Sequence, residues 1–112
     1  MSSVEEFSRE SEMLIKDLLR QPPVLFNPHR MAIMLELYHA GGAEFPQLKR
    51  DLQMTDGALA THLKALTSGK LLQSKREQVG PRTRTAFIIT RHGIDSVEEF
   101  LNTMCKIKEK LR

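Results

Sequence analysis

The residues whose types and spacing are most informative lie in the stretch MTDGALATHLKAL, from Met54 to Leu66. Leu59, Leu63 and Leu66 follow the i, i+4, i+7 spacing of a helix that buries one face. A glycine inside a helix costs up to about 1 kcal/mol relative to alanine, so a helix that keeps one beside other small residues is suited to lie close to another molecule. The residues of this outward face are Gly57, Ala60, Thr61, Lys64 and Ser68.

This face offers hydrogen-bonding groups, a methyl group and one positive charge, which a partner such as DNA can use. Thr61 can donate or accept a hydrogen bond, or place its methyl group against thymine, and Lys64 can reach a phosphate or a guanine. Gly57 would let a backbone amide at the helix start meet a phosphate, and Thr55 would cap the helix. A simpler interpretation stays open, in which Gly57 only permits a tight turn. Asp56 suits the positive end of the helix, so we expect it to be a capping charge.

A second group of candidate residues surrounds Gly80-Pro81. The flanking stretches LLQSKREQV and RTRTAFIIT are rich in residues that favour strands, which predicts a β-hairpin. Arg82 and Arg84 are its strongest candidates for contacts with DNA phosphates or the minor groove. The alternative is an ordinary solvated hairpin with a charged surface. The full set of candidate contacts in the hairpin is Lys75, Arg76, Arg82, Thr83 and Arg84.

Positive charge is concentrated in this same part of the chain. The protein has 112 residues and a net charge of +3. Residues 45–90 carry eight basic and three acidic side chains, a net charge of +5, whereas residues 1–20, 21–44 and 91–112 carry −2, −1 and +1. This concentration favours a polyanionic partner such as nucleic acid, although solvated lysines and arginines also occur on surfaces that bind nothing.

Several other kinds of chemistry have no support in the sequence. The single cysteine, Cys105, excludes an internal disulfide and fits a reducing cytoplasm. The four histidines and Cys105 show no CxxC or HxxxH spacing, so we expect no metal site. There is no glycine-rich phosphate loop and no nucleophile elbow, so we expect no enzyme activity and no cofactor. No apolar run approaches the roughly 20 residues of a membrane span, and the acidic N-terminus is unlike a signal peptide, so we expect a cytoplasmic protein that contacts no membrane.

The chain length predicts one domain, which the prolines and glycines between the periodic stretches divide into three parts. The expected fold class is mainly α with a small β-hairpin (α+β). Residues 1–21 form an N-terminal helix that stops at the prolines, and residues 91–112 form a C-terminal helix. Between them, residues 25–90 form the core. Its expected elements are a helix from Asn27-Pro28 to about Ala40, a short helix Pro46–Leu52, a tight turn with Met54 buried in it, the helix Asp56–Ser68 and the hairpin.

Both terminal helices repeat apolar residues at alternating steps of three and four, as in a heptad seam. Each seam spans about two heptads, which is too short to be stable alone. We therefore expect the two seams to form a homodimer interface across a twofold axis. The alternative is that both seams pack on the core of their own chain and give a monomer. The seam residues are Val4, Phe7, Leu14 and Leu18 in the N-terminal helix and Val97, Phe100, Met104, Ile107 and Leu111 in the C-terminal helix.

The expected elements follow the order of a winged helix-turn-helix: a helix, a short helix, a tight turn, a longer helix and a hairpin with a basic tip. The residues that fit this pattern are Met54-Thr55-Asp56-Gly57, Leu59, His62-Leu63, Leu66, Gly69, Gly80, Arg84-Thr85, Phe87 and Thr90-Arg91-His92-Gly93. On these residues the chain resembles the winged-helix transcriptional regulators of the MarR/ArsR type, over about residues 25–100.

The resemblance implies that the helix Asp56–Ser68 enters the major groove, that the hairpin tip reaches phosphates or the minor groove, and that the outer helices build a dimer. The chain departs from this family at two places. Relatives often carry more arginine at the hairpin tip, where this chain has Pro81 and Thr83. Metal-sensing relatives often carry paired cysteines on the groove-binding helix, and this chain has none there.

The expected function is therefore that of a homodimeric regulator of transcription that binds double-stranded DNA sequence-specifically, as a repressor that blocks polymerase access. A dimer would place its two groove-binding helices roughly 34 Å apart, one turn of DNA, on a near-palindromic operator. Two alternatives stay open: a winged helix that docks a protein partner, with Ile88 as its exposed apolar residue, and a non-specific nucleic-acid binder. A small-molecule effector is compatible with the sequence, but no set of residues specifies one.

Overall fold

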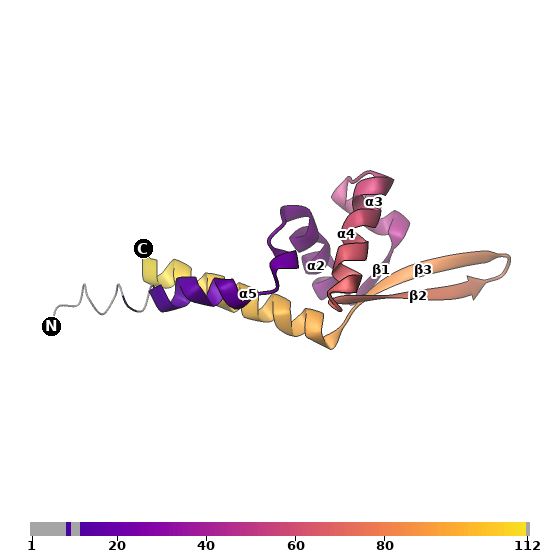
Figure 1. Ribbon diagram of the computed structural model, residues 1–112. Helices are drawn as coiled ribbons and strands as arrows, with labels where there is room; N and C mark the ends of the chain where they lie inside the picture. Colours follow the sequence, from indigo (N-terminus) through magenta and orange to yellow (C-terminus); the bar gives the residue numbers. More distant parts are fainter. Residues whose placement is uncertain (1–8, 10–11, 112) are drawn as a thin grey trace.

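The computed structural model describes residues 9 and 12–111, and these form a mostly helical fold with one small antiparallel sheet (Figure 1). This order of elements confirms the predicted fold class, a winged helix-turn-helix with a helix beyond each end of its core. Residues 12–17 are helical, and the elements after them are η1 (Leu18–Arg20), η2 (Pro23–Leu25), α2 (Pro28–Ala40), β1 (Gly42–Glu44), α3 (Phe45–Leu52), α4 (Asp56–Ser68), β2 (Leu72–Val79), β3 (Arg82–Ile89) and α5 (Arg91–Leu111).

Helix α2 begins and ends where its sequence predicts. The Asn27 side chain accepts hydrogen bonds from the backbone N–H groups of His29 (2.9 Å) and Arg30 (3.1 Å). Pro28 occupies the first turn, where its missing N–H leaves no hydrogen bond unmade. At the other end Gly41 adopts a φ of 85°, a left-handed conformation that favours glycine, and stops the helix. The helix lies at the centre of the core, where it buries Ile33, Met34 and Leu37.

Helices α3 and α4 form the helix-turn-helix, and the predicted turn, cap and buried face are all confirmed. After α3, Gln53 turns the chain with a φ of 52°, and the side chain of Met54 fills the turn with only 8% of its surface exposed. Thr55 then caps α4, because its side chain accepts a hydrogen bond from the backbone N–H of Ala58 at 3.2 Å. The buried face of α4 consists of Leu59, Leu63 and Leu66.

The hairpin is the larger part of a three-stranded sheet with the strand order β1-β3-β2. β2 and β3 pair antiparallel out to Val79 and Arg82, so a two-residue turn of Gly80 and Pro81 joins them. Gly80 has a φ of 62°, as suits the first position of such a turn. The sequence does not predict β1, which pairs with the inner end of β3 from Gly42↔Ile88 to Glu44↔Ala86. Three residues are too few to show the alternating pattern of a strand.

One apolar core joins α2, α3, α4, the sheet and the first turns of α5. Gly93 lies where α5 packs against the strand ends, and a Cβ at this position would overlap the carbonyl oxygen of Leu71. Val97, one turn further along α5, corrects the predicted dimer seam. It is fully buried in the core of its own chain, because the first turns of α5 pack against α2, so it cannot face a second copy.

Beyond the core, the outer half of α5 projects away with the N-terminal segment beside it (Figure 1). We call residues 12–20 and 100–111 the terminal arm. Met13, Leu14 and Asp17 line one hollow together with Lys110, so the two parts of the arm pack against each other within one chain. The arm and the hairpin project from opposite sides of the core, and the structure is elongated, with dimensions of 71 × 25 × 20 Å (Figure 1). The predicted N-terminal helix tightens into the 3-10 helix η1 before it reaches the prolines.

Some of the other seam residues pack within the chain, and others are exposed. Ile107 is buried, and Phe100 packs edge-to-face on Phe26 with ring centroids 5.9 Å apart. Leu14 and Leu18 are half-buried, whereas Met104 and Leu111 are exposed. Val4 and Phe7 lie outside the described residues. The spacing of three and four therefore identified the apolar side of the terminal helices but not what covers each residue.

Candidate nucleic-acid interface

The outer face of α4 has the composition that the sequence predicts. All six predicted contact residues of this region are exposed, namely Thr55, Gly57, Ala60, Thr61, Lys64 and Ser68. The three leucines on the opposite face fix the helix to the core, so this outer face has a defined position. Lys64 is its one charged residue, and the others are threonine-sized or smaller.

Gly57 is not required by the fold of the chain. A Cβ built on it would meet no atom within 4 Å, and its φ lies outside the left-handed region. The residue that makes the tight turn is Gln53. The simpler interpretation, in which Gly57 permits the turn, is therefore wrong. What an alanine would change at this position is the space available to a molecule outside the chain.

Thr61 has one part of its hydrogen-bonding capacity already used. Its hydroxyl donates a hydrogen bond to the backbone carbonyl of Gly57 at 2.9 Å, within the same helix. A hydroxyl oxygen keeps its ability to accept, so the side chain presents an acceptor and a methyl group to an approaching partner. This arrangement suits an amino group or a thymine methyl at a base edge.

Asp56, which would repel DNA if its charge were uncompensated, has a basic partner. Its carboxylate lies 2.9 Å from the ammonium group of Lys49 in α3. Both side chains are largely exposed, so the pair adds little to stability. Its effect is to offset the negative charge beside the N-terminus of α4, where Asp56 occupies the first turn as predicted.

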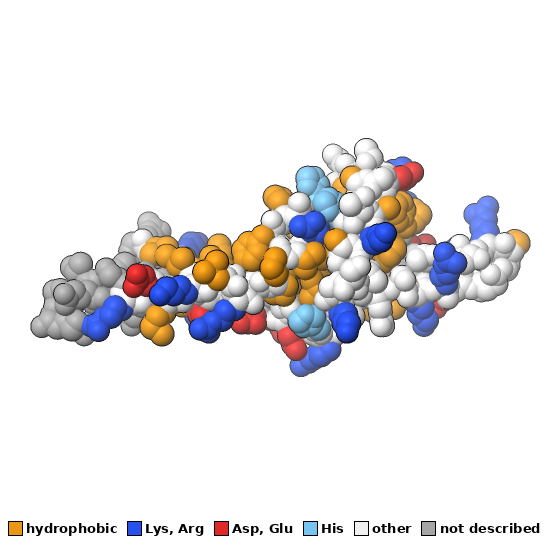
Figure 2. Space-filling model, viewed as in Figure 1, with side chains coloured by type: hydrophobic (Ala, Val, Ile, Leu, Met, Phe, Trp, Pro, Cys, Tyr) orange, Lys and Arg blue, Asp and Glu red, His pale blue; other side chains and the backbone are white. Residues whose placement is uncertain are grey.

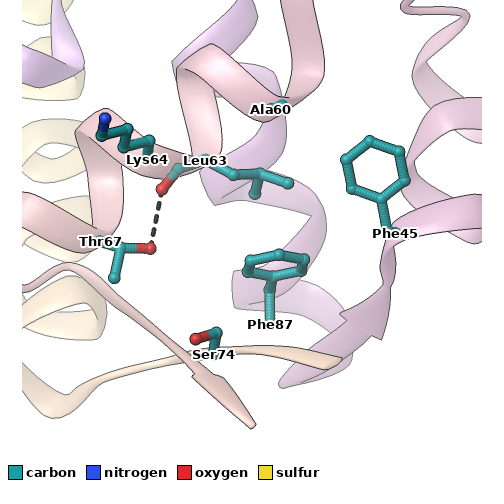
Figure 3. Close-up of a pocket in the computed structure, with 7 residues that line it drawn as sticks. All are labelled: Phe45, Ala60, Leu63, Lys64, Thr67, Ser74 and Phe87. Carbon is teal, nitrogen blue, oxygen red and sulfur yellow. Dashed lines mark hydrogen bonds between the residues drawn. The ribbon is translucent and has the colours of Figure 1, made fainter. Parts of the chain in front are cut away.

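A shallow hollow of about 320 Å³ separates α4 from the hairpin (Figure 3). The rings of Phe45 and Phe87 form one side of it, and Lys64 extends away from them. The Thr67 hydroxyl donates to the carbonyl of Leu63 at 2.7 Å, which leaves the hollow mainly apolar. Its full lining is Phe45, Ala60, Leu63, Lys64, Thr67, Ser74 and Phe87. The hairpin therefore stands beside the exposed face of α4, with an apolar recess between them.

The pairing of β2 with β3 divides the predicted hairpin contacts between two faces. Residues paired across the strands share a face, and successive residues alternate. Arg76 pairs with Thr85 and Gln78 with Thr83, on the face that also carries Phe87 and borders α4. Lys75, Arg82 and Arg84 lie on the other face. One flat surface therefore cannot contact all five predicted residues at once.

The basic residues of the hairpin also differ in their partners. Lys75 pairs with Glu77 at 3.5 Å, and Arg84 pairs with Glu44 of β1 at 3.7 Å. No such ion pair forms at Arg76 or Arg82 among residues 9 and 12–111. The sequence missed the Glu44 pair because it missed β1. Figure 2 shows Lys and Arg side chains along the hairpin and over the helical core, and hydrophobic side chains along the terminal arm.

Sequence reasoning also missed a contact between two histidines. The rings of His29, in the first turn of α2, and His62, in α4, stack with their centroids 5.5 Å apart. The two residues are too distant along the chain for any local pattern to indicate the contact. Burial, and then the positive charges of Arg30 and His29, lower the pKa of His62 below its usual value.

The described part of the chain contains neither a membrane-spanning helix nor a cluster of metal-binding side chains. None of its helices is long and apolar enough to cross a membrane. It brings together no group of three or more His, Cys, Asp or Glu side chains that could hold a metal ion.

An exposed helix of small residues, set against a basic β-hairpin on a helix-turn-helix core, defines a winged-helix nucleic-acid-binding protein. The chain belongs to the winged helix DNA-binding domain family, whose pattern matches residues 29–108. This is a DNA-binding family and not an enzyme family.

Known proteins similar to the chain agree with this assignment. It is 28% identical to the uncharacterized protein MJ0432 of Methanocaldococcus jannaschii over 73% of this chain and 89% of that one. It is 27% identical to the transcriptional regulator homologue protein from Pyrococcus horikoshii, with a TM-score of 0.79 over 88% of this chain and 97% of that structure.

More distant structures share the fold. MarR has 17% identity and a TM-score of 0.68, over 96% of this chain and 77% of that one. Reduced AbfR bound to DNA has 16% identity and a TM-score of 0.66, over 92% and 70%. The fold is thus the MarR-like winged helix of transcriptional regulators.

Proposed function

We propose that the protein is a homodimeric transcriptional regulator that binds a specific double-stranded DNA sequence. The observation that carries the proposal is Gly57, which lies on an exposed, rigidly held helix face although nothing in the described part of the chain requires a glycine there. A glycine in a helix is unfavourable, so its presence is explained by a partner that approaches the backbone closely. DNA in the major groove is such a partner.

In this proposal α4 lies in the major groove and the hairpin holds the backbone beside it. Thr61 and Lys64 contact base edges, Ala60 allows the close approach, and Gly57 exposes a backbone amide to phosphate. Thr55 and Ser68 mark the two ends of the contact. From the hairpin, Arg76 and Arg82 supply charge that no carboxylate offsets in the described structure, whereas Lys75, Thr83 and Arg84 are weaker contacts. A neighbour of similar fold, reduced AbfR, has been solved bound to DNA, which supports a DNA partner for this chain.

The terminal arm is the proposed dimer interface. It leaves large apolar side chains exposed on both of its parts: Met13, Ile15 and Leu19 in the N-terminal segment, and Leu101, Met104 and Leu111 in α5. Net charge along α5 favours an antiparallel partner, because residues 95–99 carry three acidic side chains, whereas residues 106–110 carry three lysines and one glutamate. Two copies packed antiparallel would place opposite charges next to each other around an apolar centre.

A dimer of this kind would place two α4 helices on half-sites about one DNA turn apart, so the proposed operator is near-palindromic. A protein bound there would block polymerase, which makes repression the proposed outcome. Such a regulator works in the cytoplasm. The protein-docking alternative has no specific support from Ile88, which is half-buried rather than exposed.

The dimer is tested by Met104→Glu, with Asn102→Glu as the matched control on an exposed polar position of the same helix. Sedimentation velocity should show wild-type protein and the control as dimers and Met104→Glu shifted toward monomer. Leu14→Glu should have the same effect from the other part of the arm. Sedimentation unchanged by both apolar substitutions would mean that the arm packs only within its own chain.

DNA binding is tested by fluorescence anisotropy with the duplex upstream of the protein's own gene, a scrambled duplex and two salt concentrations. A specific regulator should prefer the upstream duplex by about 1000-fold or more and bind less tightly at high salt. Equal, salt-sensitive binding to both duplexes would instead favour a non-specific binder. Absence of binding to either would contradict the proposal.

A further inference from the structure

Three basic side chains lie together beside α4, on the flank away from the hairpin. The recess next to the hairpin is lined by Ala60 and Lys64 of α4, and His62 is two residues from each of them, on the opposite side of the helix. There its ring stacks on that of His29 with an interplanar angle of 5°. Arg30 follows His29 in the first turn of α2. Figure 2 shows histidine side chains at the surface of the helical core.

The surroundings of His62 contain positive charge and no compensating negative charge among the described residues. The charged groups that act on its titration are Arg30 and His29, both from α2. The neighbouring η2 consists of a proline, a valine and a leucine, and the α4 residues one turn away from His62 (Ala58, Leu59, Ala65 and Leu66) carry no charge.

Two hydrogen-bonding features prepare the cluster for a ligand. The Arg30 Nε donates to the backbone carbonyl of Val24, which orients the guanidinium, and its terminal N–H groups form no ion pair among residues 9 and 12–111. The His62 Nδ1 is buried and has no hydrogen-bond partner in the described part of the chain.

We propose that His29, Arg30 and His62 form a binding site for one backbone phosphate of DNA, on the flank of α4 opposite the hairpin, and that filling the site draws protons onto the histidines. This inference rests on the proposed DNA-binding function. A phosphate oxyanion accepts charge-assisted hydrogen bonds from a guanidinium and from protonated imidazoles. A metal cation would be repelled by Arg30, and no third ligand joins the histidine pair among the described residues.

The sign of the pH effect follows from the charges. In the free protein, burial and then the cationic neighbours Arg30 and His29 lower the pKa of His62, which favours its neutral form. A bound phosphate adds negative charge, which favours the protonated form of His62 and makes binding take up protons. DNA affinity should therefore be higher at pH 6.0 than at pH 8.0.

The first test measures binding to a random-sequence duplex at pH 8.0 and pH 6.0 and constant ionic strength. Wild-type protein should bind about fivefold or more tightly at pH 6.0, with a steeper salt dependence, by about 0.9 in slope for each phosphate gained. The double variant His29→Gln/His62→Gln should lose this pH effect. His39→Gln, an exposed histidine at the other end of α2, should keep it. His29→Arg, with a permanent charge, should bind tightly at both pH values.

The second test needs no DNA. Inorganic phosphate, compared with chloride at equal ionic strength, should shift the imidazole proton NMR signals of His29 and His62 and leave the signals of His39 and His92 in place. Phosphate that moves neither signal, together with parallel pH curves for wild type and the double variant, would overturn the proposal. A wild-type protein that binds no duplex yet shows the phosphate shifts would contradict the proposed function and support the phosphate site.

Discussion

Helix α4 and the β-hairpin face outward from the same core, but their surfaces are built in opposite ways. α4 is fixed by three buried leucines, and its outer face presents small side chains with Lys64 as the one charge beyond the first-turn Asp56. The hairpin leaves every residue from Gln73 to Arg84 exposed, and most of its charges lie on this projecting part. A fixed surface suits hydrogen bonds to base edges, which depend strictly on distance and angle. A projecting charged ribbon suits phosphates, whose attraction falls off slowly with distance.

The largest difference between the two regions should appear in stability. Leu59→Ala removes a fully buried side chain that fixes α4, and should lower the free energy of unfolding by about 2–5 kcal/mol. Val79→Ala, at the exposed end of the hairpin, should change it by less than about 0.5 kcal/mol. Urea denaturation of both variants measures the difference. Equal losses would mean that the hairpin is as important to the core as α4.

Gly57→Ala should separate stability from DNA binding on α4 itself. The alanine favours the helix and meets no neighbour, so the protein should become more stable by up to about 1 kcal/mol. Its methyl group would occupy the space that a phosphate or base needs, and DNA affinity should fall about tenfold, or 1.4 kcal/mol. Thermal denaturation and anisotropy titration give the two values. Unchanged affinity would remove Gly57 from the interface.

Arg82→Ala and Arg84→Ala compare two arginines on one strand and one face of the hairpin. Arg82 forms no ion pair in the described structure, so its loss should reduce affinity for all duplexes and lower the salt slope by about 0.9. Arg84 is paired with Glu44, and its loss should have a smaller effect. Titrations at four salt concentrations measure both slopes. A larger effect at Arg84 would show that DNA displaces Glu44.

The smallest expected effect is on how the stability of the protein depends on pH, and it involves Glu36 in α2 and Asp51 in α3. Burial, and then the hydrogen bond and the charge of Asp51, raise the pKa of Glu36 to about 7. A carboxyl group with a raised pKa in the folded state stabilises the protein fully below its unfolded pKa of 4.5, and this stabilisation is lost as the pH rises through 7. Because Asp51 is exposed, water weakens the interaction.

Glu36→Gln should therefore make the melting temperature less dependent on pH between 5 and 8. The variant should be the more stable protein at pH 8. Val79→Ala, in the hairpin, should follow the wild-type pH curve. A Glu36→Gln curve parallel to the wild type would contradict the raised pKa.

The features predicted correctly from the sequence depend on neighbouring residues. Asn27 and Thr55 cap their helices, and Gly41 ends one, through contacts within four residues. The outer face of α4 follows from the spacing of its leucines. The features that were missed depend on residues far apart in the chain. β1, the Glu44–Arg84 pair and the stacked histidines all require the fold before they exist.

The terminal seams are a third case. Their apolar spacing is present as predicted, but it does not determine which part of the molecule covers each seam residue. Val97 and Met104 occupy equivalent positions in the heptad repeat, yet Val97 is fully buried in the core and Met104 is 42% exposed. Apolar spacing tells which side of a helix avoids water, and only the position of neighbouring elements tells what covers it.

The short β1 strand has a consequence for how the protein behaves at high concentration. Because β1 covers only residues 86–88 of β3, the outer hairpin has backbone groups along both of its edges that no strand of the described structure pairs. Open strand edges of this kind can join those of other molecules into a continuous sheet and aggregate. Mixed charges at Lys75, Arg76, Glu77, Arg82 and Arg84, with a proline in the turn, oppose this. The charges proposed to hold DNA therefore also keep the protein in solution.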